Sequence, residues 1–245
     1  MEGVFYALGA TAFPCLCTAL GAGAVFIMGG GESPRRRRCM DGFAGGVMMA
    51  ASLFSLLLPA LETAGTSGWL VAGLGVGGGA LLVLGVDRFT REYLVWEPGH
   101  RGRVVLAIAI HNLPEGMVVG LSAVLAAKTG GELAGTAALA LGIGLQNIPE
   151  GAAVSLPVRQ SGVGRGKSFF WGVASGLVEP VGGVLAALLA GAVAGWMPLL
   201  LCGAAGTMIW VTARELIPSA SSRADGTLAF LTGFVVMMML DLALG

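Results

Sequence analysis

Two copies of one short motif decide how this sequence folds. The chain reads His111-Asn112-Leu113-Pro114-Glu115-Gly116 and, further on, Gln146-Asn147-Ile148-Pro149-Glu150-Gly151. Four residues make about one helical turn, so His111 and Glu115 share a helix face, as do Gln146 and Glu150. Both copies lie inside apolar stretches, where a carboxylate is costly and marks a functional hypothesis. The pair therefore predicts two membrane helices that line a path for a cation.

The composition indicates a membrane protein. Of the 245 residues, 56% are hydrophobic and only 11% are charged. In soluble domains roughly a quarter of all residues are charged. The 42 glycines are typical of closely packed membrane helices. The formal net charge is zero, so nothing indicates a nucleic-acid partner. The four cysteines form no Cys-x-x-Cys pair, and we expect neither a zinc ribbon nor a disulfide framework.

Apolar runs of about 20 residues predict eight transmembrane helices in a single domain over residues 1–245. The predicted spans are Phe5–Met28, Gly42–Leu61, Trp69–Val86, Val104–Ala127, Leu133–Leu156, Phe169–Val193, Met197–Ile217 and Thr227–Leu244. A cleaved signal peptide has a basic segment before its apolar run, and the first apolar run here has none. We therefore interpret this run as a retained span.

The loop charges predict the orientation. Thirteen of the 14 Lys and Arg residues lie in or beside the first, third, fifth and seventh breaks between spans, and only Lys128 lies on the other side. Because cytoplasmic loops carry the Lys/Arg excess, we expect a multi-pass protein of the cell inner membrane with both termini on the non-cytoplasmic side. The run Arg35 to Arg38 is most simply a positive-inside anchor.

Each motif has a proline directly before its glutamate. Proline removes a backbone N–H, so Pro114 should free the carbonyl of Ile110, and Pro149 that of Leu145. The glycine that follows each glutamate loosens the same turn. Transporters line polar sites with the backbone oxygens of such broken helices. An ordinary proline kink is the structural alternative, but repetition of the pattern in consecutive spans favours a functional role.

The side chains of the motifs suit a divalent metal. Imidazole from His111, together with carboxylate and amide oxygens, fits zinc and also iron or manganese. An all-oxygen magnesium or calcium site fits less well with His111 present. The second histidine, His100, lies in a basic stretch and is interpreted as solvated.

Other spans add candidates. Met48 and Ser55 lie on one helical face with Ala51 and Ser52; we interpret Ala51 and Ser52 as packing residues and Met48 as a soft donor. Glu179-Pro180 repeats the carboxylate–proline pairing at mid-span. Two more acids are ambiguous, since Glu215 either pairs with Arg214 or guides ions, and Asp241 also lies in an apolar stretch.

Eight spans with His-Asn-x-Pro-Glu-Gly in the fourth and x-Asn-x-Pro-Glu-Gly in the fifth resemble the ZIP (Zrt/Irt-like protein) metal transporters, particularly the GufA-like branch. The resemblance implies an all-α bundle in which spans one to three and six to eight form an inverted repeat around spans four and five. It also implies a binuclear metal centre. The first metal would be bound by Met48, His111, Glu115, Gln146 and Glu150. The second would be bound by Asn112, Glu115, Asn147, Glu150 and Glu179.

This sequence departs from the family pattern in two places. Many family members have histidine where this chain has Gln146, and an amide is a weaker zinc ligand than imidazole, so we expect a broader range that includes cadmium, iron and manganese. The long histidine-rich loop of many relatives is also absent, because residues 87–103 contain a single histidine, His100.

The leading hypothesis is a transporter that moves divalent metal into the cytoplasm, with zinc as the favoured metal. The metal is then substrate, no organic cofactor is expected, and the protein is not an enzyme. An intramembrane metallohydrolase is the second hypothesis, but it needs a general base as in His-Glu-x-x-His, and Asn112 cannot act as one. A passive channel with the same ligands is the third, and saturable, slow flux would argue against it. The glycine-rich helices are compatible with a homodimer.

Overall fold

The computed structural model describes the chain except residues 1, 28–32, 94–100, 130–132, 161 and 245; for helical residues 90–93, 101–111, 129, 133, 157, 160, 193–194 and 244 it describes only the backbone. Every regular element in this described part is a helix, which confirms the predicted all-α class. The α-helices are α1 (Glu2–Ala22), α2 (Ala24–Ile27), α3 (Pro34–Ala51), α4 (Leu58–Ala64), α5 (Gly68–Tyr93), α6 (Arg101–Thr129), α7 (Leu133–Gln160), α8 (Arg165–Gly176), α9 (Val178–Leu188), α10 (Ala190–Val193), α11 (Met197–Val211), α12 (Ile217–Ala220) and α13 (Ala224–Leu244). Short segments of other helical type join them: π-helical η1 (Ser52–Leu57) and η4 (Thr212–Leu216), and 3₁₀-helical η2 (Gly65–Ser67) and η3 (Ala194–Trp196).

The helices continue beyond the predicted spans into the polar stretches. The second span was expected from Gly42, but α3 begins at Pro34, where Ser33 accepts a hydrogen bond from the Arg36 N–H at 3.3 Å. A serine cap followed by proline at the first helical position is a strong start signal. At its far end α5 continues through Asp87 to Tyr93. An apolar run therefore marks only part of a helix, because backbone hydrogen bonding continues where the side chains turn polar.

The expected breaks at the motif prolines are wrong. The backbones of α6 and α7 are helical on both sides of Pro114 and Pro149. A proline removes one backbone hydrogen bond, and the close packing of these helices holds the remaining turns. The sixth span is interrupted instead: α8 ends at Gly176 and α9 begins at Val178, so Glu179 lies in the first turn of a new helix.

Several helical segments are long and apolar enough to cross a membrane. Among the described residues five qualify, namely Glu2–Ile27, Pro34–Phe89, Arg165–Leu188, Met197–Ala220 and Ala224–Ala243. The second contains 56 residues, more than one crossing of a roughly 30 Å hydrocarbon core requires. The turn inside it lies at Gly65, whose φ of 59° is a conformation that favours glycine. The chain is therefore built as a polytopic membrane protein.

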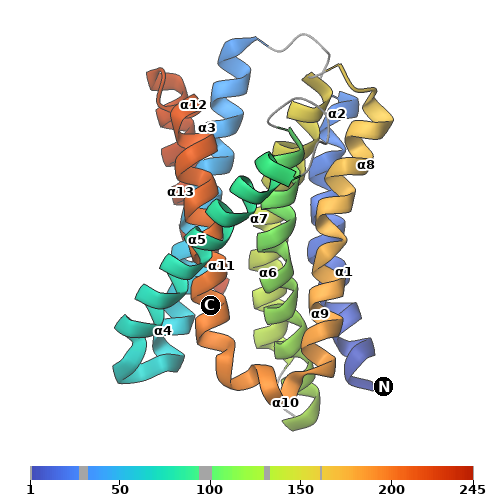
Figure 1. Cartoon of the computed structure of the whole chain (residues 1–245), viewed down its shortest axis with the longest axis vertical. Helices are drawn as coiled ribbons and strands as arrows, with labels where there is room; N and C mark the ends of the chain where they lie inside the picture. The colour runs from blue at the N-terminus through green and yellow to red at the C-terminus, as the bar shows by residue number, and fades with distance from the viewer. Residues whose placement is uncertain (1, 28–32, 94–100, 130–132, 161, 245) are drawn as a thin grey trace.

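Two groups of helices make up the bundle (Figure 1). In one group α1 packs against α6, α7, α8 and α9, and α6 also packs against α9. In the other group α3 packs against α13, and α11 packs against α5. The groups meet where α6 contacts α11 and α3 contacts α7. The two motif helices thus lie where the groups join.

Glycines let the helix backbones touch within each group. A methyl group at Gly46 would overlap the Phe230 carbonyl across the α3–α13 contact, and one at Gly79 would overlap the Gly203 carbonyl across the α5–α11 contact. Small residues at such contacts are typical of membrane helix pairs. Close packing therefore accounts for much of the high glycine content.

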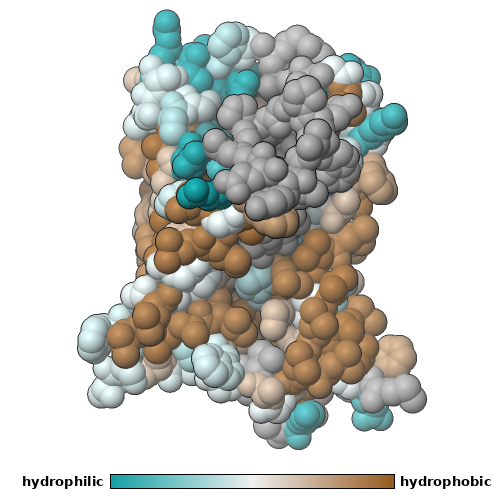
Figure 2. All heavy atoms as spheres, viewed as in Figure 1, coloured by the Kyte–Doolittle hydropathy of each residue, from teal (hydrophilic) through white to brown (hydrophobic). Residues whose placement is uncertain are grey.

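The surface has an apolar belt. Figure 2 shows hydrophobic side chains around the middle of the molecule and hydrophilic ones gathered at the end where α3 begins. Large apolar side chains are exposed, among them Phe5 by 72%, Leu20 by 71% and Leu81 by 67%. An apolar surface of this extent is what a lipid bilayer covers.

The arginine run at the start of α3 pairs with carboxylates of the protein itself. Arg38 donates to both carboxylate oxygens of Asp225, at 3.2 and 3.1 Å, and Arg35 lies 3.5 Å from the same carboxylate. Arg37 lies 3.7 Å from Asp41, which also accepts a hydrogen bond from Ser219. These contacts join the start of α3 to α12 and α13, so the arginines from Arg35 to Arg38 help to hold these helices together.

Candidate metal site

Six polar side chains of the predicted ligand set are completely buried in the helix group around α1. They are Asn112 and Glu115 on α6, Gln146, Asn147 and Glu150 on α7, and Glu179 on α9, and each is 0% exposed. Burying such groups is costly unless they find partners. The structure thus places every described polar residue of the predicted ligand set in the protein interior.

Two carboxylates are turned towards neutral donors. Glu115 accepts a hydrogen bond of 2.8 Å from the Gln146 amide, which joins α6 to α7. Glu179 accepts one of 3.1 Å from the Thr18 hydroxyl, which joins α9 to α1. Glu150 of α7 interacts electrostatically with both carboxylates, and Glu115 also interacts with Glu179. The three glutamates are therefore close enough to repel one another, and a cation among them would relieve that repulsion.

The two asparagines donate hydrogen bonds to the backbones of neighbouring helices, and Asn147 also interacts with Glu179. Asn112 donates to the Ser175 carbonyl at the end of α8 at 3.1 Å. Asn147 donates to the Pro14 carbonyl of α1 at 3.4 Å. Within the described part of the chain, five buried oxygens of this cluster accept no hydrogen bond: Asn112 Oδ1, Glu115 Oε2, Gln146 Oε1, Asn147 Oδ1 and Glu179 Oε2. All five are electron-pair donors, which is what a metal cation requires.

The glutamates alone do not form a finished metal site. Among the described residues, no three His, Cys, Asp or Glu side chains lie together closely enough to hold a metal ion. The predicted set also contains His111, whose side chain lies outside the described residues, and the neutral ligands Met48, Asn112, Gln146 and Asn147. The three glutamates would therefore need these other residues to complete a metal site.

The motif glycines pack rather than loosen their turns. A methyl group at Gly116 would overlap the Glu179 carbonyl, and one at Gly151 would overlap the Thr18 carbonyl. Each motif thus combines a buried glutamate with a glycine that lets another helix approach its backbone, α9 at Gly116 and α1 at Gly151. The Gly116 contact thus holds α6 against α9, and the Gly151 contact holds α7 against α1.

The candidates of the second, seventh and eighth spans are placed differently. Met48 is 1% exposed and lies in a hydrophobic cluster with Val118 of α6 and Met208 of α11. Ser55 donates to Asp241 at 2.6 Å, which joins η1 to α13. Glu215 is exposed and lies 3.9 Å from Arg214, so its pairing with arginine is the alternative that the structure favours.

Sequence reasoning did not identify Thr18 or the Pro14 carbonyl as partners of the cluster. Both lie on α1, one turn apart, and their contacts depend on how α1 packs against α7 and α9. A threonine one turn after a proline in an apolar span was the available signal, but threonine in a helix usually bonds to its own backbone. Thr18 does this as well, with a hydrogen bond to the Pro14 carbonyl at 3.2 Å.

Replacing Thr18 tests whether Glu179 needs this donor. We expect Thr18→Val to keep the fold and to lower metal uptake by roughly tenfold, since a hydrogen bond to a charged group contributes about 1.5–3 kcal/mol. Thr11→Val is the matched control, because Thr11 is equally buried on the same helix but, among the described residues, its hydroxyl bonds to backbone carbonyls of α1 alone. Equal uptake by the two variants would show that the Thr18–Glu179 bond is structural only.

The fold and the buried polar centre define a class: a polytopic membrane protein of helices with carboxylates and amides in its interior. Within that class, the sequence profile described as "ZIP Zinc transporter" matches residues 103–241. The chain is 39% identical to "Zinc transporter ZIPB" of Bordetella bronchiseptica, over 87% of this chain and 73% of the relative. It is 35% identical to "Zinc transporter GufA" of Myxococcus xanthus, over 93% of this chain and 95% of the relative. "Zinc transporter ZIP11" of Homo sapiens is 32% identical and aligns with 100% of this chain and 98% of its own length.

The chain belongs to the ZIP family of transporters. This confirms the resemblance found in the motifs, including the likeness to a GufA protein, and it confirms that the protein is not an enzyme.

Proposed function

We propose that this protein transports divalent metal, zinc first, across the cell inner membrane into the cytoplasm. The observation that carries the proposal is the set of five buried oxygens on α6, α7 and α9 that find no hydrogen-bond donor among the described residues; two of them belong to Glu115 and Glu179, which interact with each other and with Glu150. Three relatives that span most of this chain are named zinc transporters, which supports zinc as the first substrate.

We assign the ligands as two overlapping sets around a binuclear centre. Met48, His111, Glu115, Gln146 and Glu150 bind one ion, and Asn112, Glu115, Asn147, Glu150 and Glu179 bind the other. The shared Glu115 and Glu150 bridge the ions and supply the negative charge that offsets desolvation of a divalent cation. The amides are weaker ligands, and they allow the ion to leave as well as bind.

The helix arrangement supports a carrier mechanism. We propose eight crossings, with both termini on the non-cytoplasmic side and an inverted repeat around α6 and α7. Ions arrive near Ser55 and Asp241, which are hydrogen-bonded to each other. Movement of the group around α1 against the group of α3, α5, α11 and α13 then exposes the site to the cytoplasm. Since most predicted ligands lie in the first group, the site would move with it.

Zinc flux into vesicles tests this function. Purified protein in vesicles that contain a zinc-sensitive dye should give a saturable dye response when zinc is added outside, whereas vesicles without protein should stay dark. Cells that express the protein should show a rise in a cytosolic zinc sensor, which checks the direction. Flux that rises linearly with zinc would favour a passive channel, and its absence for zinc, cadmium, iron and manganese would contradict the proposal.

Gln146 is the residue that we expect to set metal selectivity. Gln146→His should raise the preference for zinc over manganese by roughly tenfold, because imidazole binds zinc more strongly than an amide oxygen does. Competition between the two metals in the vesicle assay measures the preference. Gln146→Ala is the control, since it removes the hydrogen bond to Glu115 without adding a ligand. If both variants shift the preference alike, Gln146 is not a metal ligand.

A further inference from the structure

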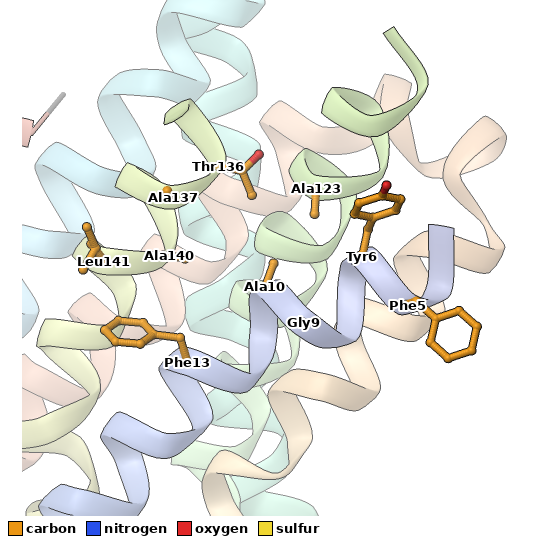
Figure 3. A pocket seen from close by; sticks show the side chains of 10 residues that line it. All are labelled: Phe5, Tyr6, Gly9, Ala10, Phe13, Ala123, Thr136, Ala137, Ala140 and Leu141. Atoms are coloured by element: carbon orange, nitrogen blue, oxygen red, sulfur yellow. The ribbon is translucent and has the colours of Figure 1, made fainter. Parts of the chain in front are cut away.

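A groove of about 530 Å³ lies between α1, α6 and α7, and none of the buried glutamates lines it (Figure 3). The α1 wall contains the small residues Gly9 and Ala10 between the rings of Tyr6 and Phe13. Ala123 of α6 and Ala137, Ala140 and Leu141 of α7 form the opposite side. In Figure 3 the Phe13 ring extends towards Leu141 and Ala140, and Tyr6 extends towards Ala123.

The groove is apolar and belongs to the lipid-facing surface. Its lining has two side-chain hydroxyls, on Tyr6 and Thr136, and the Thr136 hydroxyl is hydrogen-bonded to Ser122 at 2.9 Å. The rim is exposed, with Phe5 at 72%, Phe13 at 41% and Leu141 at 40%. Water in such a groove would gain few hydrogen bonds, and a polar ligand would find few partners there.

We propose that this groove binds an acyl chain of a membrane phospholipid. From Phe5 to Phe13 the α1 wall is about 12 Å long, close to the roughly 15 Å depth of one leaflet of the hydrocarbon core. A helix of a second copy would not fit inside it, because ten helical residues, about 15 Å long and 10 Å wide, occupy more than ~1,000 Å³. The Tyr6 ring at the amino-terminal end of α1 is the kind of residue found at the headgroup level. The chain therefore comes from the leaflet at that end of α1.

The groove adjoins the support of the candidate metal site. Phe13 packs against the α7 backbone at Gly144, since a methyl group at Gly144 would meet its ring. The next residue, Pro14, accepts the hydrogen bond from Asn147. An acyl chain in the groove thus lies against the α1–α7 contact. The proposal that lipid binds here does not depend on the proposed transport function. Only an effect of the bound lipid on transport would depend on that function.

Photolabelling can test the site. The full-length protein is placed in vesicles of phosphatidylcholine, a fraction of which carries a diazirine in the middle of one acyl chain, and labelled peptides are identified by mass spectrometry. We expect label to concentrate on residues 5–13 and 136–141. Gly9→Leu should lower it at least about fivefold, because nothing lies within 4 Å of a Cβ atom added there, so the leucine side chain starts in open space on the groove wall.

Gly77→Leu is the matched control. Gly77 is also an exposed glycine within a helix, with nothing within 4 Å, but it lies on α5, so labelling of the groove should be unchanged. If Gly9→Leu does not fold, Ala137→Leu fills the groove from the α7 side. Label spread evenly over the lipid-facing helices, or unaffected by groove filling, would overturn the proposal. Label that falls as the protein-to-lipid ratio rises would show that a second copy covers the groove, and would overturn it too.

Discussion

Zinc uptake is expected to fall at least about 100-fold when Glu115 is replaced by glutamine. The change keeps the size of the side chain, and a glutamine oxygen can still accept the hydrogen bond that Gln146 donates at 2.8 Å. What is lost is one negative charge in a fully buried site. Removing one partner of a buried charge pair costs about 3–5 kcal/mol, which corresponds to a factor of 100 or more. Initial rates in the vesicle assay measure the loss.

The control for this variant is Glu62→Gln, which removes the same charge from an exposed position on α4. Its uptake should match the wild type, and Glu115→Gln should be as helical and as soluble in detergent as the wild type. Normal uptake by folded Glu115→Gln would show that the metal does not pass by Glu115.

Gly116→Ala is expected to destabilise the protein, although alanine is the better helix former. The added methyl group would overlap the Glu179 carbonyl, so α6 and α9 must move apart. Overpacking of this kind costs about 1–3 kcal/mol, which corresponds to a fall in Tm of roughly 2–12 °C in a chain of this size. Uptake should fall as well, because Glu179 is displaced from the cluster.

Gly77→Ala separates packing from helix propensity. Nothing lies within 4 Å of a side chain added at Gly77, so only propensity acts, and it favours alanine by about 1 kcal/mol. Thermal unfolding in detergent should therefore shift down for Gly116→Ala and slightly up for Gly77→Ala. A shift in the same direction for both would contradict the close α6–α9 contact.

Much of the fold could be predicted from the sequence, because a membrane limits what an apolar run of about 20 residues can be. The positions of the helices follow from those runs. Their ends do not: α3 starts eight residues before Gly42 because Ser33 caps it. The interruptions within helices do not follow from the apolar runs either. Pro114 and Pro149 lie in continuous helices, whereas the sixth span is interrupted at Leu177. Proline predicts a lost hydrogen bond, but packing decides whether the helix bends.

The candidate site could be predicted in part for a similar reason. Glu115, Gln146 and Glu150 were identifiable because a buried polar group in an apolar span requires an explanation. The donors on α1 were not, because the contact between Thr18 and Glu179 joins residues 161 positions apart. Nor did the sequence link Ser55 to Asp241, although it had marked both. Pairings across helices depend on tertiary packing, which one sequence does not specify at this level.

Equilibrium binding of zinc tests the central claim most directly. The claim is that the buried oxygens around Glu115, Glu150 and Glu179 hold the transported metal. Dialysis of purified protein against increasing zinc should saturate at two ions per chain in the wild type. The double variant Glu115→Gln/Glu150→Gln, confirmed to be folded, should bind less than about a tenth as much at the same free zinc. Unchanged binding by the folded double variant would place the metal elsewhere and contradict the account.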